Sequence, residues 1–258
     1  NTYDGFIVTA RDHITGDTVT YTIYPKKWQI SFSDEFSGSY LDNSKWLVEF
    51  SNTSATVANG LLTLLAEKID RPGQEPIYTI SGVSTRGRFT QKFGCFVTRM
   101  KTPDRGGCNS GFWLMPDGAY MEDAFFTDAE YPNMGCSEID IVEYSPFFGN
   151  SYTATMHFWD RNTGEHLARG NWIETPQLIY PDYHEYACIW NEDGIYFYFD
   201  GKPYLANEAI FTPDDAVEAY TFLSNNSARI HEGLEWLGPC TDDMFPFVAT
   251  FDWVRIYR

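Results

Sequence analysis

The sequence predicts an all-β fold, specifically a two-sheet antiparallel sandwich, and three observations lead to it. Aromatic residues make up 17% of the 258 residues, and aromatic and β-branched side chains favour strands. Short alternating segments are separated by turn sequences such as Asn59-Gly60 and Asp200-Gly201, where glycine or asparagine allows a positive φ. Residues 213–219 are the best helical candidate, and no helical period continues beyond about two turns. Strands without intervening helices favour an antiparallel sandwich over a parallel sheet.

Five segments predict strands, in chain order. Residues 18–23 alternate threonine with larger side chains, and residues 60–65 start at a turn glycine and continue with leucines around one threonine. Residues 94–100 and 195–199 are rich in aromatic and β-branched residues, and residues 251–257 alternate apolar and polar side chains near the end of the chain. Each of these patterns is typical of a pleated strand with one buried face.

The length is compatible with one large β-sandwich core, so we predict one main domain. We place this domain at residues 27–258, where an alternating segment begins, and treat residues 1–26 as an N-terminal extension. The extension is either an extra edge hairpin or the tail of an upstream module. The long, polar and aromatic segment 116–135 suits an elaborated loop over a functional face.

The charge balance excludes two classes of partner. There are 18 lysines and arginines against 36 aspartates and glutamates, which gives a net charge of −18. Nucleic acids and anionic membranes are bound mainly through clustered basic residues, so neither is expected as a partner. No apolar run approaches the roughly 18 residues of a membrane helix. The first residues lack a signal-peptide pattern, and we expect any targeting segment to have been removed.

The five cysteines are scattered and contain no Cys-x-x-Cys pair that would indicate zinc or a redox dithiol. They are interpreted as buried small apolar residues, and a disulfide between Cys108 and Cys136 remains an alternative.

The strongest chemical signal is a strand with three carboxylates, Glu138, Asp140 and Glu143. Alternation places Glu138 and Asp140 on one face, but Glu143 is out of phase with them. A β-bulge near Ile141-Val142 would return Glu143 to the same face and leave the aliphatic side chains behind it.

Three carboxylates on one face repel one another, so at least one holds its proton to a higher pH. Double-displacement glycoside hydrolysis needs this asymmetry, because one carboxylate attacks the anomeric carbon while another, protonated, assists the leaving oxygen. A solvated acidic strand face and a calcium site are the competing interpretations. Aromatic residues near in sequence, Trp113, Tyr131 and Trp159, favour a glycan cleft.

Motifs along the chain resemble those of a known family. They are Ser33-Asp-Glu-Phe36 with Lys45-Trp46, Asn59-Gly-Leu-Leu62, Tyr78-Thr-Ile-Ser-Gly82, Asn109-Ser-Gly-Phe-Trp-Leu-Met-Pro116, Glu138-Ile-Asp-Ile-Val-Glu143, Tyr183-His-Glu-Tyr186, Phe199-Asp-Gly201 and Phe251-Asp-Trp-Val-Arg-Ile-Tyr257. In this order they resemble glycoside hydrolase family 16, the laminarinase, lichenase and agarase group, from about Trp28 to Arg258. The carboxylate segment is similar to the family's bulged subgroup.

The resemblance implies a β-jelly roll with a substrate cleft across a concave sheet, and hydrolysis with retention of configuration. It implies that Glu138 is the nucleophile, Asp140 its helper and Glu143 the acid/base. It also implies substrate contacts at five further positions: Asn109 and Trp113 near the cleavage point, Tyr131 in the loop before the acids, His157 on the leaving-group side near Glu143, and Trp236 at the cleft edge.

Many members of this family hold a structural calcium on the convex face, and the matching positions here are Glu35, the carbonyl of Gly60, and Asp252. No cofactor is expected for catalysis. One departure concerns the glucose-specific subsite, because the family's Trp-Pro before the catalytic strand is replaced here by Tyr131-Pro132.

The sequence therefore predicts a secreted or cell-surface endo-β-glycanase that cuts a neutral polysaccharide, with β-1,3-glucan or mixed-linkage β-1,3-1,4-glucan as the first candidate. An endo-β-galactosidase acting on galactan or host O-glycans is the alternative enzyme, and a non-catalytic glycan-binding module is the alternative class. We expect a monomer whose partner is its polysaccharide or oligosaccharide substrate.

Overall fold

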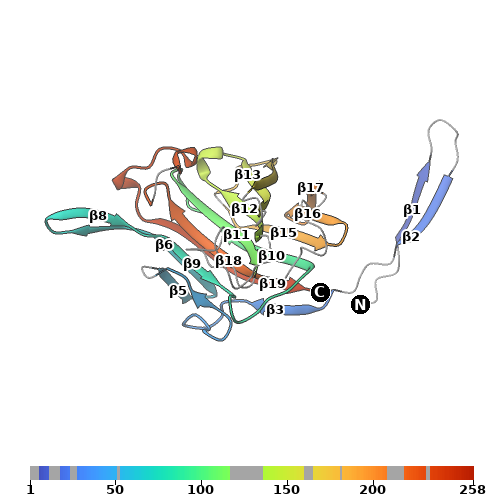
Figure 1. Cartoon of the computed structure of the whole chain (residues 1–258), viewed down its shortest axis with the longest axis horizontal. Coiled ribbons are helices and arrows are strands. Elements are labelled where there is room, and N and C mark those ends of the chain that lie inside the picture. Colours follow the sequence, from blue (N-terminus) through green and yellow to red (C-terminus); the bar gives the residue numbers. More distant parts are fainter. Residues whose placement is uncertain are drawn as a thin grey trace.

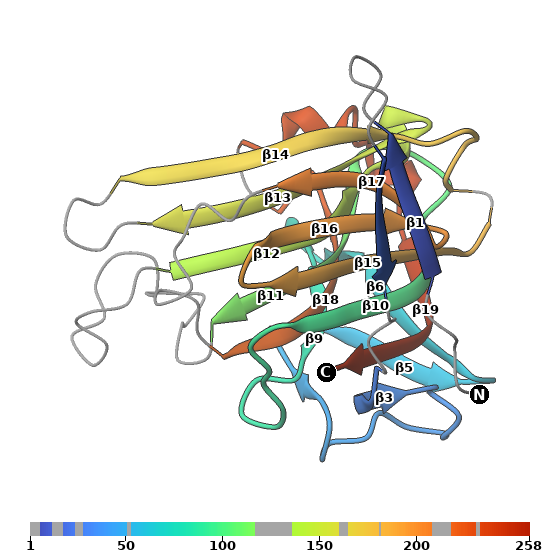
Figure 2. The same ribbon diagram turned by 90° about the vertical axis from the view of Figure 1, so that its right-hand side faces the viewer.

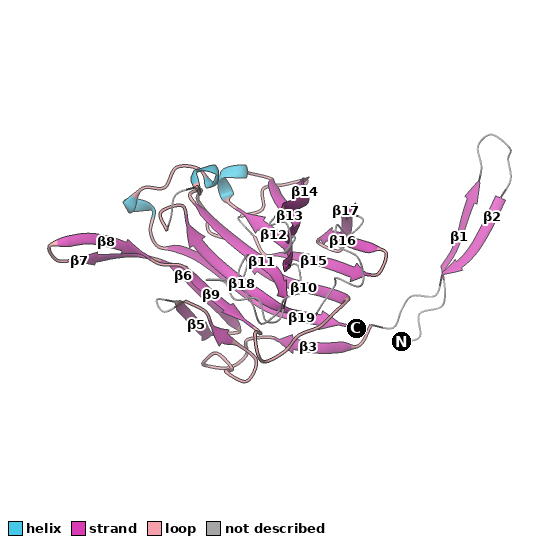
Figure 3. Cartoon of the chain, viewed as in Figure 1, coloured by secondary structure: helices cyan, strands magenta, loops and turns pink. Residues whose placement is uncertain are grey.

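The computed structural model describes residues 6–11, 18–23, 28–50, 53–116, 136–159, 165–180, 182–207, 218–230 and 233–258. Two antiparallel sheets dominate these residues, as the sequence predicted (Figure 1). Short helical turns, η1 (Pro146–Phe148), η2 (Glu235–Leu237) and η3 (Asp242–Met244), gather on one side of the molecule (Figure 3). Among the described helical turns, none is long and apolar enough to span a membrane.

One sheet has seven strands within the described residues. Their spatial order is β14 (His166–Glu174), β13 (Ser151–Trp159), β12 (Cys136–Tyr144), β11 (Cys108–Pro116), β18 (Ala219–Ser227), β9 (Ser81–Ser84) and β4 (Leu47–Val48). Strand β14 lies at one edge of this sheet (Figure 2).

The other sheet has eight described strands. Their order is β17 (Lys202–Asn207), β16 (Gly194–Phe199), β15 (His184–Asn191), β10 (Gly94–Lys101), β19 (Phe247–Tyr257), β6 (Leu61–Ala66) and β5 (Ser54–Ala58), and β3 (Ile30–Asp34) also pairs with β19. Two hairpins stand apart from these sheets, β1 (Phe6–Arg11) with β2 (Thr18–Ile23) and β7 (Lys68–Arg71) with β8 (Gln74–Tyr78).

The five predicted strands are all present, with ends that differ by a few residues at most. Residues 213–217 of the helical candidate, and the loop 117–135, lie outside the described residues. Within the extension, residues 6–11 and 18–23 form a hairpin. Its role and the boundary at residue 27 stay predictions.

The core lies between the two sheets and follows from the alternation along each strand. In β6 every second side chain is buried, and Phe96 of β10 and Phe197 of β16 meet Phe112 of β11 and Val142 of β12 in one continuous apolar cluster. Burial of one face of each strand therefore fixes which residues point outward. On the seven-stranded sheet, the outward face carries the polar residues described below.

Candidate active site

The β-bulge predicted in the carboxylate strand is present in β12. On one side Phe112 pairs with Val142 while Trp113 pairs with Asp140, so Ile141 has no partner on β11. On the other side the register with β13 shifts between Asp140 and Glu143. The bulge buries Ile141 and Val142 in the core and returns Glu143 to the face of Glu138 and Asp140.

The three carboxylates line one cavity of about 530 Å³ on the outward face of the seven-stranded sheet. The cavity extends from β12 across β11 and β18 toward the side chains of Phe50, Tyr78 and Ile80. It combines a concave shape, apolar and aromatic walls and a few converging polar groups, which is the usual composition of a ligand site.

Burial is the largest cause of the raised pKa values of all three carboxyl groups. The charge of Asp140 further raises the pKa of Glu138, and the charge of Glu143 further raises the pKa of Asp140. Glu138 and Asp140 are also joined by a hydrogen bond between their side chains. The group therefore retains protons at pH values where an exposed carboxyl group is ionised, as acid catalysis near neutrality requires.

Two predicted residues contact the acids directly. Asn109 Nδ2 donates a hydrogen bond to Glu143 Oε1 at 3.1 Å, which opposes the rise in the pKa of Glu143. His157 was predicted near Glu143, and its charge lowers the pKa of Glu143. Its Nε2 lies 3.2 Å from Asp140 Oδ2, and across β12 and β13 the residue pairs with Glu138.

Trp113 lines the cavity wall beside the acids. Its ring stacks on Phe222 with centroids 4.4 Å apart, and its Nε1 donates a hydrogen bond to Ser224 Oγ at 3.2 Å. These contacts hold the ring in the cavity wall, and its role near the cleavage point stays a prediction. Trp236 is 40% exposed in η2 but is not part of the cavity wall. Tyr131 lies outside the described residues.

Sequence reasoning missed several residues of the cavity wall, among them Phe50, Ser224 and Asn226. Ser224 and Asn226 belong to β18, and the alternation within 219–227 places them on one face. That face is known to be the cavity face only once β18 is paired with β11. Phe50 lies far from these strands in the sequence, and no local sequence pattern indicates that it lines the cavity.

The carboxylates of the predicted calcium site form ion pairs with arginines of the eight-stranded sheet. Both carboxylate oxygens of Glu35 accept hydrogen bonds from Arg255 at 2.8 Å, and Asp252 is paired with Arg99. Gly60 occupies the turn between β5 and β6 with a φ of 77°. Because each carboxylate already has a cationic partner, the arrangement does not fit an oxygen-ligated calcium. In the described part of the chain, no group of three or more His, Cys, Asp or Glu side chains has the spacing of a metal site.

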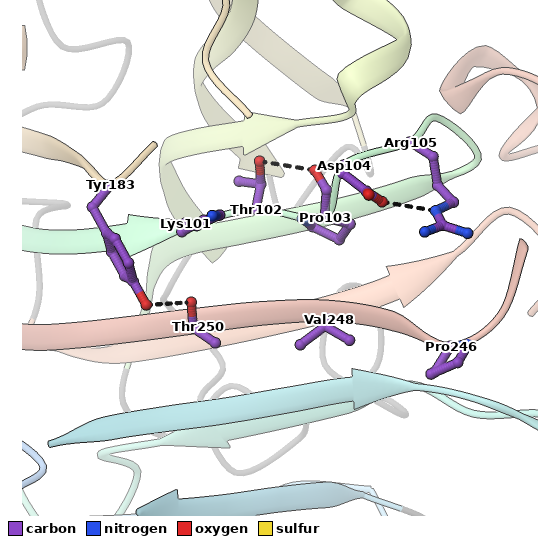
Figure 4. Close-up of a pocket in the computed structure, with 9 residues that line it drawn as sticks. All are labelled: Lys101, Thr102, Pro103, Asp104, Arg105, Tyr183, Pro246, Val248 and Thr250. Carbon is purple, nitrogen blue, oxygen red and sulfur yellow. Dashed lines mark hydrogen bonds and ion pairs between the residues drawn. The ribbon is translucent and has the colours of Figure 1, made fainter. Parts of the chain in front are cut away.

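A second cavity, of about 430 Å³, lies against the other sheet (Figure 4). Tyr183 and Thr250 line it and are joined by a hydrogen bond of 2.8 Å between their hydroxyl groups, and Lys101 and Arg105 also line it. Among the described residues that line it, Asp104 is the one carboxylate, and it accepts a hydrogen bond from Arg105. Without a second acid it lacks the pair that glycoside hydrolysis needs, so the cavity at Glu138 is the candidate active site.

Comparison with known proteins agrees with this geometry. The sequence model of the family described as glycosyl hydrolases family 16 matches residues 42–253. A β-glucanase of Rhodothermus marinus is 27% identical over 254 residues, which cover 90% of this chain and 85% of that protein. A glucan endo-1,3-β-glucosidase A1 of Niallia circulans is also 27% identical, and the match covers 90% of this chain but 37% of that longer protein.

Among solved structures, the laminarinase catalytic domain of Thermotoga maritima superimposes with a TM-score of 0.71. The match covers 90% of this chain and 99% of that domain at 20% sequence identity. At this level of identity the comparison shows the fold, which is a two-sheet β-jelly roll.

Proposed function

The chain belongs to glycosyl hydrolase family 16, and from that membership we propose that it is a retaining endo-β-glycanase that hydrolyses internal β-linkages of a polysaccharide. The observation that carries the proposal is the bulged strand β12, which brings Glu138, Asp140 and Glu143 to one face of the sheet, where all three line one cavity. β-1,3-Glucan and mixed-linkage β-1,3-1,4-glucan are the first candidate substrates, and the β-glucanase relative supports them.

The geometry supports a division of roles between the acids. The hydrogen bond between Glu138 and Asp140 raises the pKa of Glu138 and lowers that of Asp140, so Glu138 donates and the Asp140 carboxylate accepts. Glu138 attacks the anomeric carbon in the molecules in which its carboxyl group has lost this proton. Glu143 gives its proton to the leaving oxygen as the glycosidic bond breaks. It then takes a proton from the water that releases the sugar from Glu138.

Asp140 and Asn109 act as positioning residues in this scheme. Asp140 lies between the two glutamates and near His157, which supplies a polar partner for its carboxylate. Asn109 orients the Glu143 carboxyl through its amide nitrogen. The amide oxygen of Asn109 has no hydrogen-bond partner among the described residues, so it is available to accept a hydrogen bond from a sugar hydroxyl group.

Reducing-end release by the wild type and by Glu138→Gln on laminarin, lichenan, agarose and a mucin-type glycan tests the proposal. We expect release by the wild type on a β-glucan and at least about a hundredfold less by the variant, the lower range for a positioned catalytic group. Release from agarose or mucin glycan alone would favour the galactosidase alternative. Equal release by both proteins would contradict the assignment of Glu138.

The remaining parts of the proposal are a place of action outside the cytoplasm and a monomeric state, and they do not include a structural calcium. The first follows from a polymeric substrate, and the second from an active site assembled within one chain. Calcium would have to displace Arg255 from Glu35 and Arg99 from Asp252, so the arginine pairs count against it.

A further inference from the structure

The cavity at the acids occupies only one side of β12. Its walls come from β11, β18 and the residues near β9, whereas β13 and β14 continue the same sheet on the other side of the acids (Figure 2). An endo-acting enzyme holds sugar units on both sides of the bond it cleaves. The outward face of β13 and β14 is therefore the place to seek the second half of the binding site.

The strand register places Trp172 on this face, in line with Glu143. Glu143 pairs with Thr153 of β13, and Thr153 pairs with Trp172 of β14. Directly paired residues point to the same side of a sheet. The next residue, Ile173, is buried in the core, which confirms that Trp172 points outward. Two strand spacings, about 10 Å, separate the backbones at Glu143 and Trp172.

The sheet surface beside Trp172 is formed by residues with small side chains. Thr155 and Gly170 continue the row of Asp140, and Ala168 continues the row of Glu138 beyond His157. A side chain at position 170 has no space, because a Cβ atom there would lie 2.4 Å from Thr155 Oγ1. Small residues therefore form an open floor next to the acids.

Two other aromatic rings support Trp172. Phe148 of η1 meets it edge to face at 4.6 Å and stacks on Trp236 of η2 at 5.7 Å with an interplanar angle of 8°. Trp172 nevertheless stays 56% exposed and Trp236 40% exposed. Exposed apolar residues that form one contiguous patch can mark a binding surface, and flat rings stack well on the apolar face of a sugar.

We propose that Trp172, supported by Phe148 and Trp236, is the platform of a subsite for the leaving-group half of the glycan. This inference deepens the proposed function and rests on it. Glu143 protonates the leaving oxygen in that scheme, and Trp172 lies in the same row as Glu143. The sugar released first therefore lies over Thr153 and the low floor, with Trp172 under or beside it.

The test compares a substrate with sugar units on both sides of the cleaved bond with one that has none on the leaving side. Laminarin presents sugar units on both sides, whereas β-laminaritriosyl fluoride releases only a fluoride ion. If the substrate panel selects another glycan, that polymer and its glycosyl fluoride replace this pair. We expect Trp172→Ala to lower kcat/KM on the polymer by about tenfold, the value of one lost aromatic stacking contact, and to leave fluoride release within about twofold of wild type.

Three further variants keep the test decisive. Trp172→Phe retains a flat ring and should recover most of the activity on the polymer. Ala168→Trp adds bulk to the floor and should lower activity on the polymer while leaving fluoride release, which needs no group in this subsite, nearly unchanged. Leu167→Ala truncates an exposed apolar side chain of the same strand that points to the other side of the sheet, and it should behave as wild type on both substrates.

Equal loss on both substrates, or no loss on either, would overturn the platform. This outcome is distinct from failure of the proposed function, which would appear as activity that survives Glu138→Gln. A Trp172→Ala protein that does not fold still leaves Trp172→Phe and Ala168→Trp to decide the matter.

Discussion

At the scale of single residues, the raised pKa of Glu138 makes the fold less stable as the pH rises. Between the unfolded and folded pKa values the folded state binds more protons than the unfolded state, so its stability falls with increasing pH. Glutamine keeps the shape of the side chain and removes this effect. We predict that Glu138→Gln is more stable than wild type at pH 7, by on the order of 1 kcal/mol.

The same comparison at low pH provides the control. Below about pH 4 the carboxyl group is protonated in both the folded and the unfolded state, so the two proteins should unfold at nearly the same urea concentration. Glu192→Gln, in the exposed turn between β15 and β16, should change stability little at either pH. A gain that is equal at pH 4 and pH 7 would show that charge repulsion is not its source.

A second prediction concerns the hydrogen bond from Asn109 to Glu143. This bond favours the ionised carboxylate and lowers the pKa of Glu143. Asn109→Ala removes it, so the pKa of Glu143 should rise and the acid should stay protonated to higher pH. We predict that the basic limb of the kcat/KM profile moves to higher pH, with a loss at the optimum of roughly tenfold or less.

Asn226→Ala is the matched variant, because Asn226 lines the same cavity without a hydrogen bond to Glu143 among the described contacts. It should change the rate without moving the basic limb. Because the carboxyl groups interact, the profile reports the pKa values of the group as a whole. A basic limb that moves to lower pH in Asn109→Ala would contradict the assigned direction.

At the scale of strands, the sequence was sufficient to predict the bulge but insufficient to predict its neighbours. The bulge follows from a local conflict, because Glu143 is out of phase with Asp140 while Ile141 and Val142 both need burial. The position of Trp172 beside Glu143 has no such local signal. It depends on two strand pairings, β12 with β13 and β13 with β14. Pairing register is set by tertiary packing and is not written in either strand alone.

The outer-face arginines show the same limit. Glu35 and Asp252 have the residue types of calcium ligands, but Arg255 and Arg99 reach them from β19 and β10. We predict that calcium and a chelator give the same thermal unfolding temperature for the wild type. Both pairs are partly exposed to solvent, so Glu35→Gln should cost less than about 1 kcal/mol.

Arg255→Gln supplies the opposite case, because it leaves the Glu35 carboxylate free for a cation. A calcium-dependent rise in Tm in this variant alone would show that the arginine occupies the position a metal would take. A rise of several degrees in the wild type would instead show that calcium displaces the arginines, and the prediction would be wrong.

At the scale of the whole molecule, the net charge of −18 acts on the approach of any charged polymer. The Debye length falls from about 30 Å at 0.01 M salt to about 8 Å at 0.15 M, so repulsion between enzyme and substrate weakens over this range. The rate of reaction with a neutral β-1,3-glucan should not depend on the salt concentration. A carboxymethylated β-1,3-glucan has the same linkage and a negative charge, and its encounter with the enzyme should be slow at low salt.

We predict that kcat/KM on the carboxymethylated glucan rises about fivefold or more between 0.01 M and 0.15 M NaCl, while kcat/KM on laminarin changes less than about twofold. Initial rates at substrate concentrations well below KM measure both. A rate on the carboxymethylated glucan that falls with salt would show local attraction stronger than the overall charge, and Lys101 and Arg105 at the second cavity would be the first residues to replace.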